Sequence, residues 1–267
     1  FNMVDFPAPF LPTKPTRSCL FTINEIELNI ALSAKCKTAL LIPTIGAKVP
    51  NSLSKKGDFC STMKHEIEVR RTAHYYHEKA QKTPKGIVIV FHGYAQLAEK
   101  FITEFKSLTN EGYDVYAPEA LSKFYNRDRK PVASWMTSHE REDEIKDNNN
   151  YLNDLYAVIK ERDNDVPIHV IGFSQGVSTL LRWYEQTPLM AQSIHLIAGS
   201  IPEELIVSGS KKLKSCYYYH GTVDKLVTKK HITRYLDQLD KICAEHIFVK
   251  FIGRHEIPAK LLEYFIA

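Results

Sequence analysis

We base the predicted fold of this chain on the stretch Ile168-His169-Val170-Ile171-Gly172-Phe173-Ser174-Gln175-Gly176-Val177. It is an apolar, largely β-branched run that ends in Gly-x-Ser-x-Gly and leads directly into a helical pattern. In the strand-turn-helix known as the nucleophile elbow, the serine adopts a strained backbone conformation, and the glycines keep side chains out of the crowded turn. The first N–H groups of the helix then point at the place where an oxyanion would form. The stretch predicts that Ser174 is a nucleophile mounted at the end of a buried strand.

Apolar strand patterns alternate with helical patterns over most of the chain from residue 63 onward. Strands are expected at residues 64–71, 86–91, 113–117, 167–173, 193–198, 215–219 and 246–251. Helices are expected at residues 97–109, 145–159, 175–186, 228–243 and 258–265, and residues 119–140 are expected to be a long connection. Buried strands separated by amphipathic helices specify a mostly parallel central sheet with helices on both faces. The predicted fold class is therefore α/β, with the site at the carboxyl ends of the strands.

Composition and length are those of an ordinary soluble globular protein. The 267 residues are 44% hydrophobic and 25% charged, with a net charge of +4. Residues 63–267 hold 28 basic against 27 acidic side chains, so no basic face indicates a nucleic-acid partner. No apolar run reaches the ~18–20 residues that span a bilayer, and no signal-peptide pattern opens the chain. We therefore predict a cytoplasmic protein without stable membrane insertion, and its oligomeric state stays open.

Residues 1–62 differ from the rest of the chain. They carry six of the thirteen prolines and three of the five cysteines, and no periodicity is sustained there. We interpret them as a loosely ordered extension or a mis-assigned start, and place the functional domain at residues 63–267. The cysteines form no C-x-x-C pair and no cluster with zinc spacing, which favours reduced thiols and no metal site. Cys216 and Cys243 are expected to be buried free thiols.

Two further residues follow predicted strands in the order that a serine hydrolase needs. A serine hydroxyl requires an imidazole to take its proton, and a carboxylate to orient that imidazole. In α/β-hydrolases the order along the chain is nucleophile, acid, histidine. Asp224 follows the strand at 215–219, and His255 follows the strand at 246–251. Taken singly, Asp224 is as well explained as a turn or helix-capping residue and His255 as a surface side chain, but their joint placement predicts a Ser174-Asp224-His255 triad.

The predicted oxyanion hole takes one backbone N–H from each of two segments. The residue after the nucleophile, Gln175, supplies one donor, and the loop after an earlier strand supplies the other. That loop begins at His92-Gly93, which by itself is also explained as a simple strand-ending turn. We predict that the N–H of Tyr94 is the second donor.

Four motifs resemble the phospholipase/carboxylesterase/thioesterase family of α/β-hydrolases, which contains the acyl-protein thioesterases. They are Phe91-His92-Gly93-Tyr94, Gly172-Phe173-Ser174-Gln175-Gly176, His220-Gly221-Thr222-Val223-Asp224 and Gly253-Arg254-His255-Glu256-Ile257. Residues 117–125 and 133–137 look similar to a bacterial branch of predicted esterases. The resemblance covers residues 63–267. It departs at Tyr94-Ala95-Gln96, where acyl-protein thioesterases usually have Leu-Gly-Asp, so their substrate preference is not carried over.

The resemblance implies hydrolysis of a small-molecule carboxylic ester or thioester through an acyl-enzyme on Ser174, with no cofactor. His255 would act as base and then as acid, and Asp224 would orient it. Tyr125, Trp135 and Met136 are candidates for a substrate pocket. An alternative is that Trp135 and Met136 pin their loop onto the core. Two other functions stay open, a serine peptidase on the same scaffold and a catalytically silent hydrolase fold that binds a ligand or partner.

Overall fold

The computed structural model describes residues 63–162, 166–208, 213–261 and 263–266. The predicted extension at residues 1–62, with its three cysteines, lies outside the described residues. The chain divides into two units between Ile67 and Glu68, and the fold reported below belongs to the unit that ends at Ala267.

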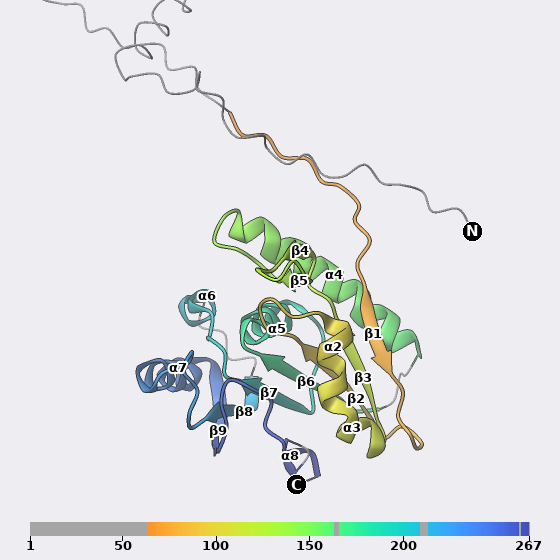
Figure 1. Cartoon of the computed structure of the whole chain (residues 1–267), viewed down its shortest axis with the longest axis vertical. Coiled ribbons are helices and arrows are strands. Elements are labelled where there is room, and N and C mark those ends of the chain that lie inside the picture. Colours follow the sequence, from red (N-terminus) through yellow and green to blue (C-terminus); the bar gives the residue numbers. More distant parts are fainter. Residues whose placement is uncertain (1–62, 163–165, 209–212, 262, 267) are drawn as a thin grey trace, which may run out of the picture. The chain divides into compact units, whose positions relative to one another are not determined.

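Seven strands form one mixed sheet in that unit (Figure 1). In spatial order they are β1 (Tyr75–Glu78), β3 (Tyr113–Pro118), β2 (Gly86–Phe91), β6 (Ile168–Phe173), β7 (Ser193–Ile197), β8 (Leu213–Gly221) and β9 (Cys243–Phe251). Only the edge strand β1 runs antiparallel to its neighbour, and the other five pairs are parallel. The expectation of a mostly parallel central sheet is confirmed.

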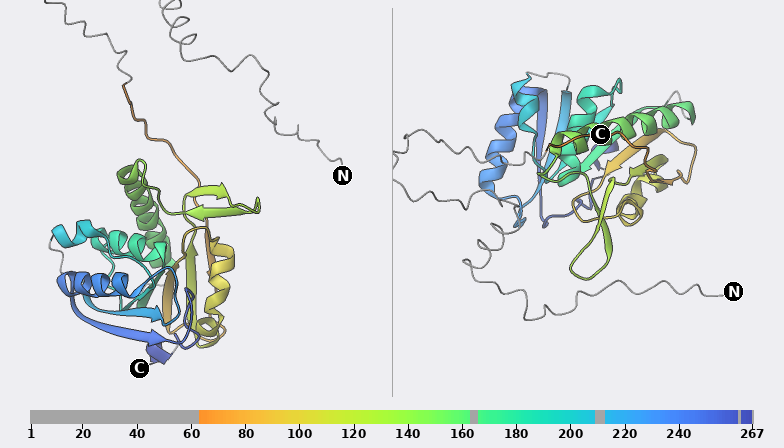
Figure 2. Two further views of the ribbon diagram at one scale, coloured as in Figure 1. Left: turned by 60° about the vertical axis from the view of Figure 1, so that its left-hand side comes forward. Right: turned by 90° about the horizontal axis from the view of Figure 1, so that it is seen from above.

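Helices cover both faces of the sheet (Figure 2). The helical elements are α2 (Ala98–Phe101), the 3-10 turn η2 (Ile102–Phe105), α3 (Lys106–Asn110), α4 (Arg141–Arg162), α5 (Gln175–Gln186), α6 (Glu203–Val207), α7 (Lys229–Ile242) and α8 (Glu263–Ile266). On one face Phe101 of α2 stacks on Phe173 of β6, with ring centroids 6.0 Å apart. On the other face Trp183 of α5 packs against Phe91 of β2 at 5.6 Å. Alternate side chains of each strand therefore meet different helices.

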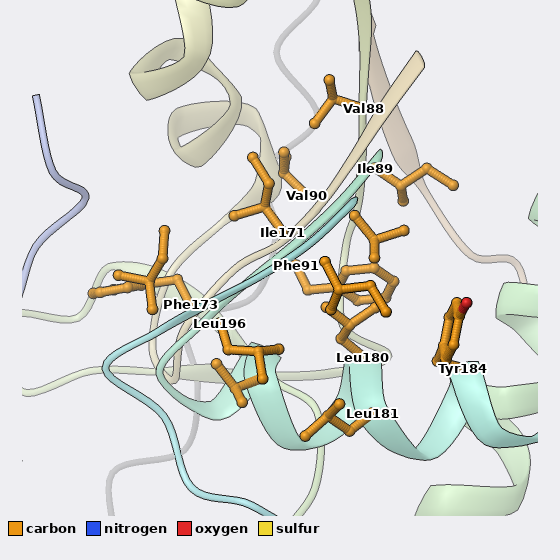
Figure 3. Packing of buried hydrophobic residues seen from close by; sticks show 14 of the residues in the cluster. Val88, Ile89, Val90, Phe91, Ile171, Phe173, Leu180, Leu181, Tyr184 and Leu196 are labelled. Atoms are coloured by element: carbon orange, nitrogen blue, oxygen red, sulfur yellow. The ribbon is translucent and has the colours of Figure 1, made fainter. Parts of the chain in front are cut away.

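The core is densest where α5 packs on β2, β6 and β7 (Figure 3). All six residues of β2 and all six of β6 are buried, as expected for strands covered on both faces. Leu180 of α5 and Leu196 of β7 lie between the helix and the sheet with no exposed surface. Burial of each such side chain contributes about 1.5–3 kcal/mol. This packing fixes the beginning of α5, and with it the residue between β6 and α5.

The connection expected at residues 119–140 contains a β-hairpin that the sequence patterns did not reveal. Strands β4 (Ser122–Tyr125) and β5 (Pro131–Ser134) pair antiparallel and project from the body of the unit (Figure 2). A bridge between Gln96 and Ala133 joins the hairpin to the loop after β2. These strands are only four residues long, and β4 is half exposed, so neither gives a sustained alternation.

Three expected elements differ from the structure. Residues 64–71 form no strand, and Ile67 and Val69 are 87% and 78% exposed, because no neighbouring strand pairs with this stretch. The helix expected at 97–109 is interrupted by η2, and the helix expected at 258–265 is limited to α8. Periodicity sets which face is apolar, but it does not say where the backbone hydrogen bonds change register.

Candidate active site

Ser174 occupies a strained turn between β6 and α5. Its φ is 54° and its ψ is −117°, a conformation that costs a non-glycine residue about 1–3 kcal/mol. The two glycines of the motif are needed for close packing around the turn. A Cβ at Gly176 would lie 2.2 Å from the carbonyl oxygen of Phe91, and one at Gly172 would lie 2.7 Å from the Cα of Val177. The sheet and helix therefore approach closely enough to hold the serine in this conformation.

Asp224 and His255 form a hydrogen-bonded pair at the carboxyl ends of β8 and β9. The Nδ1 of His255 lies 2.8 Å from the Oδ2 of Asp224. The Asp224 side chain has no exposed surface, whereas that of His255 is 18% exposed. Because β6, β8 and β9 run parallel, their carboxyl ends share one edge of the sheet. The pair is thus placed at the edge where Ser174 lies.

The charge on Asp224 is stabilised by the backbone around it. Its Oδ1 accepts hydrogen bonds from the N–H groups of Leu226, at 2.7 Å, and Val227, at 3.0 Å. Burial of the carboxyl works to raise its pKa, but the hydrogen bonds from Val227, His255 and Leu226 outweigh it and hold the pKa below the usual range. Asp224 is therefore an ionised acceptor, and it fixes the tautomer of His255 that carries its proton on Nδ1.

The His255 ring lies beside the strand that carries Ser174. Its centroid is 4.9 Å from that of Phe173, the residue before Ser174. Within the described residues, the Ser174 hydroxyl makes no hydrogen bond to His255. Catalytic hydrogen bonds in unliganded enzymes are often long and tighten when the substrate binds. The three side chains gather at one edge of the sheet, but only two of the three are hydrogen-bonded.

The loop after β2 passes directly beside Ser174. A Cβ built on Gly93 would lie 3.2 Å from the Cβ of Ser174. The backbone N–H groups of Tyr94 and Gln175 have no acceptor among the residues that the structure describes. In contrast, the N–H groups of Gly93 and Ala95 are satisfied by Gln96 Oε1 and the Ala133 carbonyl. The two N–H groups predicted to be oxyanion donors are those left available.

His92 holds the peptide that contains the Tyr94 N–H. The His92 side chain is fully buried, and burial lowers its pKa to about 4, so the ring is neutral. Its Nε2 accepts the N–H of Ala120 at 3.1 Å, which leaves the proton on Nδ1. Nδ1 then donates to the Gly93 carbonyl at 2.7 Å. Because this carbonyl and the Tyr94 N–H belong to one planar peptide, the ring fixes the direction of that N–H.

The Gln175 side chain fastens the end of the hairpin to α5. Its Oε1 accepts the N–H of Trp135 at 3.1 Å, and its Nε2 donates to the Met136 carbonyl at 2.8 Å. Trp135 is also tied inward, because its Nε1 donates to the His92 carbonyl at 2.8 Å. From the sequence we expected only the backbone N–H of Gln175 to take part in the site, and we expected the loop at His92-Gly93 to supply the N–H of Tyr94. The motifs named both residues but contained no signal for these side-chain contacts.

The three candidates for the substrate pocket lie in different surroundings. Trp135 is 1% exposed and packs against His92, with ring centroids 5.0 Å apart, so its indole belongs to the core. Met136 joins it in lining a small pocket with residues of α4 and α5, and Ser174 is not part of that lining. Tyr125 is 75% exposed at the end of β4 away from the hairpin's bridge to Gln96. The contacts of Trp135 are those of the alternative in which it holds its loop against the core, and a substrate pocket at these three residues stays a prediction.

Other expectations concern cysteines, metals and membranes. Cys216 and Cys243 are buried free thiols, as predicted. In the described part of the chain, no group of three or more His, Cys, Asp or Glu side chains is arranged to hold a metal ion. Among the described residues, no helix is long and apolar enough to cross a bilayer.

A mostly parallel sheet with helices on both faces and a strained serine between β6 and α5 defines the class: the chain has the α/β-hydrolase fold. No protein-family model matches the sequence, and no curated protein matches it. Three similar solved structures are all below 25% identical to this chain, so they establish the fold alone.

The first, Zea mays acyl-protein thioesterase 2, has a TM-score of 0.56 and 16% identity, over 73% of this chain and 96% of that chain. The second, esterase PE8, has a TM-score of 0.55 and 19% identity over 73% and 96%. The third, a phospholipase/carboxylesterase from Dyadobacter fermentans, has a TM-score of 0.53 and 19% identity over 74% and 97%. Each of these proteins is thus covered almost entirely by residues of this chain.

Proposed function

We propose that the protein is a serine hydrolase that cleaves small-molecule carboxylic esters or thioesters through an acyl-enzyme on Ser174. The observation that carries the proposal is the buried Asp224, bound to His255 at 2.8 Å, at the sheet edge where Ser174 has a strained φ of 54°. The fold does not require a strained serine and a buried carboxylate bonded to an imidazole to occur together. Their coincidence is the arrangement that activates a serine.

In the first half of the reaction, the Ser174 oxygen attacks the carbonyl carbon of the substrate. The hydroxyl proton passes to Nε2 of His255, and the Asp224 carboxylate stabilises the resulting imidazolium. The negative charge that forms on the carbonyl oxygen is met by the N–H groups of Tyr94 and Gln175. When the tetrahedral intermediate collapses, the leaving alcohol or thiol takes the proton from His255, and the acyl group stays on Ser174.

In the second half, water replaces the leaving group. His255 removes a proton from the water while the hydroxyl attacks the acyl carbon, and it then returns the proton to the Ser174 oxygen. The carboxylic acid is released, and the serine is restored. Every proton in the cycle is thus carried by His255, and no step needs a cofactor.

We also propose membership of the phospholipase/carboxylesterase/thioesterase family. The names of the three similar structures support an ester or thioester substrate over a peptide. The serine peptidase therefore stays an alternative outcome of the test, and so does a fold that binds without catalysis. The domain at residues 63–267 is proposed to carry the activity, and a cytoplasmic location is likewise a proposal.

The test is turnover of a short p-nitrophenyl ester, an acyl thioester and a peptide amide, together with fluorophosphonate labelling mapped to one serine. We expect ester or thioester turnover, a label on Ser174, and a loss of several orders of magnitude in kcat/KM for Ser174→Ala. The matched control is Ser208→Ala, which removes a hydroxyl after α6 whose one partner among the described residues is the Leu205 carbonyl.

The outcomes separate the three functions. Cleavage of the amide in preference to both esters would favour the peptidase. A correctly folded protein that neither turns over any substrate nor reacts with fluorophosphonate would favour the silent fold. Equal turnover by Ser174→Ala and the unmodified protein would exclude the serine mechanism.

A further inference from the structure

Exposed apolar side chains gather on the two loops that carry Asp224 and His255. Val223, Leu226 and Ile252 are 57%, 67% and 97% exposed. The loops are joined, because the N–H of Val223 donates to the Gly253 carbonyl at 3.0 Å and that of Thr222 to the Phe251 carbonyl at 2.9 Å. The two loops are therefore held side by side, and both of them present exposed apolar side chains, which differs from single apolar residues scattered over a surface.

Five exposed cations lie on the same two segments as these apolar side chains, residues 222–230 and 250–256. They are Lys225, Lys229, Lys230, Lys250 and Arg254, and within the described residues none of them forms an ion pair. The acidic residues of the same segments, 222–230 and 250–256, are Asp224, which is buried, and Glu256. We call the three apolar residues and the five cations the basic apolar rim. Its charge contrasts with the near balance of residues 63–267 as a whole.

Two of the cations are placed where the fold does not favour them. Lys229 and Lys230 open α7, and no acidic residue lies in its first turn. The amino end of a helix carries partial positive charge, which disfavours cations there. Folding therefore gives no reason for two lysines at this position, and an anionic partner does.

We propose that the basic apolar rim docks the protein on an anionic lipid surface. Apolar side chains that enter the interface, flanked by cations that meet the headgroups, are the chemistry of peripheral membrane binding. The rim lies at the carboxyl ends of β8 and β9, the sheet edge that also carries Ser174. Docking there presents the proposed catalytic site to esters held in the lipid. The inference rests on the proposed function only for this consequence, and binding itself does not require catalysis.

The test is sedimentation with vesicles of phosphatidylcholine alone or with about one third phosphatidylserine, using the full chain carrying Ser174→Ala. Catalytic inactivity keeps this result independent of the proposed function. We expect at least about tenfold stronger partitioning onto the anionic vesicles, and loss of most of it when salt rises from about 0.1 to about 0.5 M.

Two pairs of variants separate the apolar and ionic contributions. Val223→Ser with Ile252→Ser, and Lys229→Glu with Lys230→Glu, are each expected to lower partitioning about tenfold or more. The matched controls are Met190→Ser, an exposed apolar residue in the loop between α5 and β7, and Lys241→Glu in the last turn of α7. The controls are expected to bind as the parent does.

Three outcomes would overturn the proposal. One is equal or absent partitioning on the two kinds of vesicle. Another is a loss of partitioning in Lys229→Glu/Lys230→Glu but not in Val223→Ser/Ile252→Ser. That result would indicate only a general attraction to polyanions. The third is a loss in the controls equal to that in the rim variants.

Discussion

The two sides of the candidate site are built in opposite ways. Beside Ser174, the loop after β2 and the end of the hairpin are held against the core by the buried side chains of His92 and Trp135 and by the half-buried side chain of Gln175. Around Asp224 and His255, a single buried carboxylate sits in loops whose other side chains are largely exposed. We call these the clamped side and the open side.

The difference follows from what each side has to hold. The clamped side positions backbone N–H groups, whose direction depends on the whole peptide and so needs several fixed side chains. The open side positions one imidazole, that of His255. Its partner Asp224 is held in place by two backbone N–H groups. The remaining surface of the open side is then free for another use.

The largest effect is expected from Asp224→Asn, which tests whether the open side depends on that one carboxylate. An amide in place of the carboxylate favours the wrong tautomer of His255, so we expect kcat to fall by about three to four orders of magnitude with little change in Tm. Asp237→Asn, at an exposed position of α7, is the control. Steady-state kinetics on a short ester provide the measurement. An Asp224→Asn enzyme within tenfold of the parent would contradict the assigned role.

Trp135→Ala tests the clamped side through stability. Removing a buried indole and its hydrogen bond to the His92 carbonyl should lower the free energy of unfolding by about 3–5 kcal/mol. Tyr125→Ala, at the exposed end of the hairpin, should change it by no more than about 0.5 kcal/mol. Urea unfolding of both variants gives the comparison. Similar losses in the two variants would mean that the hairpin, and not the Trp135 anchor, stabilises this side.

His92→Phe separates positioning from packing on the clamped side. The ring volume is nearly kept, but the donor to Gly93 and the acceptor for Ala120 are lost. We expect kcat to fall about 10- to 100-fold with KM nearly unchanged, because the proposed oxyanion role of the Tyr94 N–H is exerted in the transition state. His92→Asn, which can restore a donor to Gly93, should recover part of kcat. A lower Tm with kcat unchanged would show that His92 only supports the fold.

Two further buried histidines lie in a hydrogen-bonded row across the sheet and add to the acid sensitivity of the fold. His169 Nδ1 is 2.7 Å from Ser193 Oγ, which is 2.7 Å from His195 Nε2, and His195 Nδ1 is 2.8 Å from the Tyr219 hydroxyl. Burial lowers the pKa of His169 to about 4, and burial together with the nearby His169 lowers that of His195 to about 3. Both rings, like His92, are held neutral in the fold.

These shifts predict the most gradual effect, a loss of stability with acid. At pH values well above about 6.5 the three histidines are neutral in both states and cost nothing. As the pH falls from about 6.5 toward about 4, the unfolded chain takes up protons that the folded chain refuses, at about 1.4 kcal/mol per proton and pH unit. Urea unfolding at several pH values should show this slope, reduced by one proton in His92→Asn. Constant stability between pH 6.5 and 4.5 would contradict it.

Much of the fold is readable from local pattern because it depends on burial. The strand at 86–91 and the helix at 175–186 were predicted with the bounds that the structure gives, since both are long, apolar on a defined period and delimited by glycine or a polar residue. The strand expected at 64–71 has an equally regular alternation, but it is exposed. An alternating pattern specifies a strand only when another strand pairs with it, and pairing is not a local property.

The α/β layering and the chemical groups that follow β6, β8 and β9 could be predicted from the sequence, because they depend on residue type and order. Which atoms contact one another depends on the tertiary structure. It showed that Trp135 is a core anchor, that His92 orients the Tyr94 peptide, and that Gln175 holds the hairpin by its side chain. Hydrogen bonds between residues about 30 to 40 positions apart form only when the donor and the acceptor are positioned to within a few tenths of an ångström. Such distances are set by the packing of the whole unit, and no stretch of sequence encodes them alone.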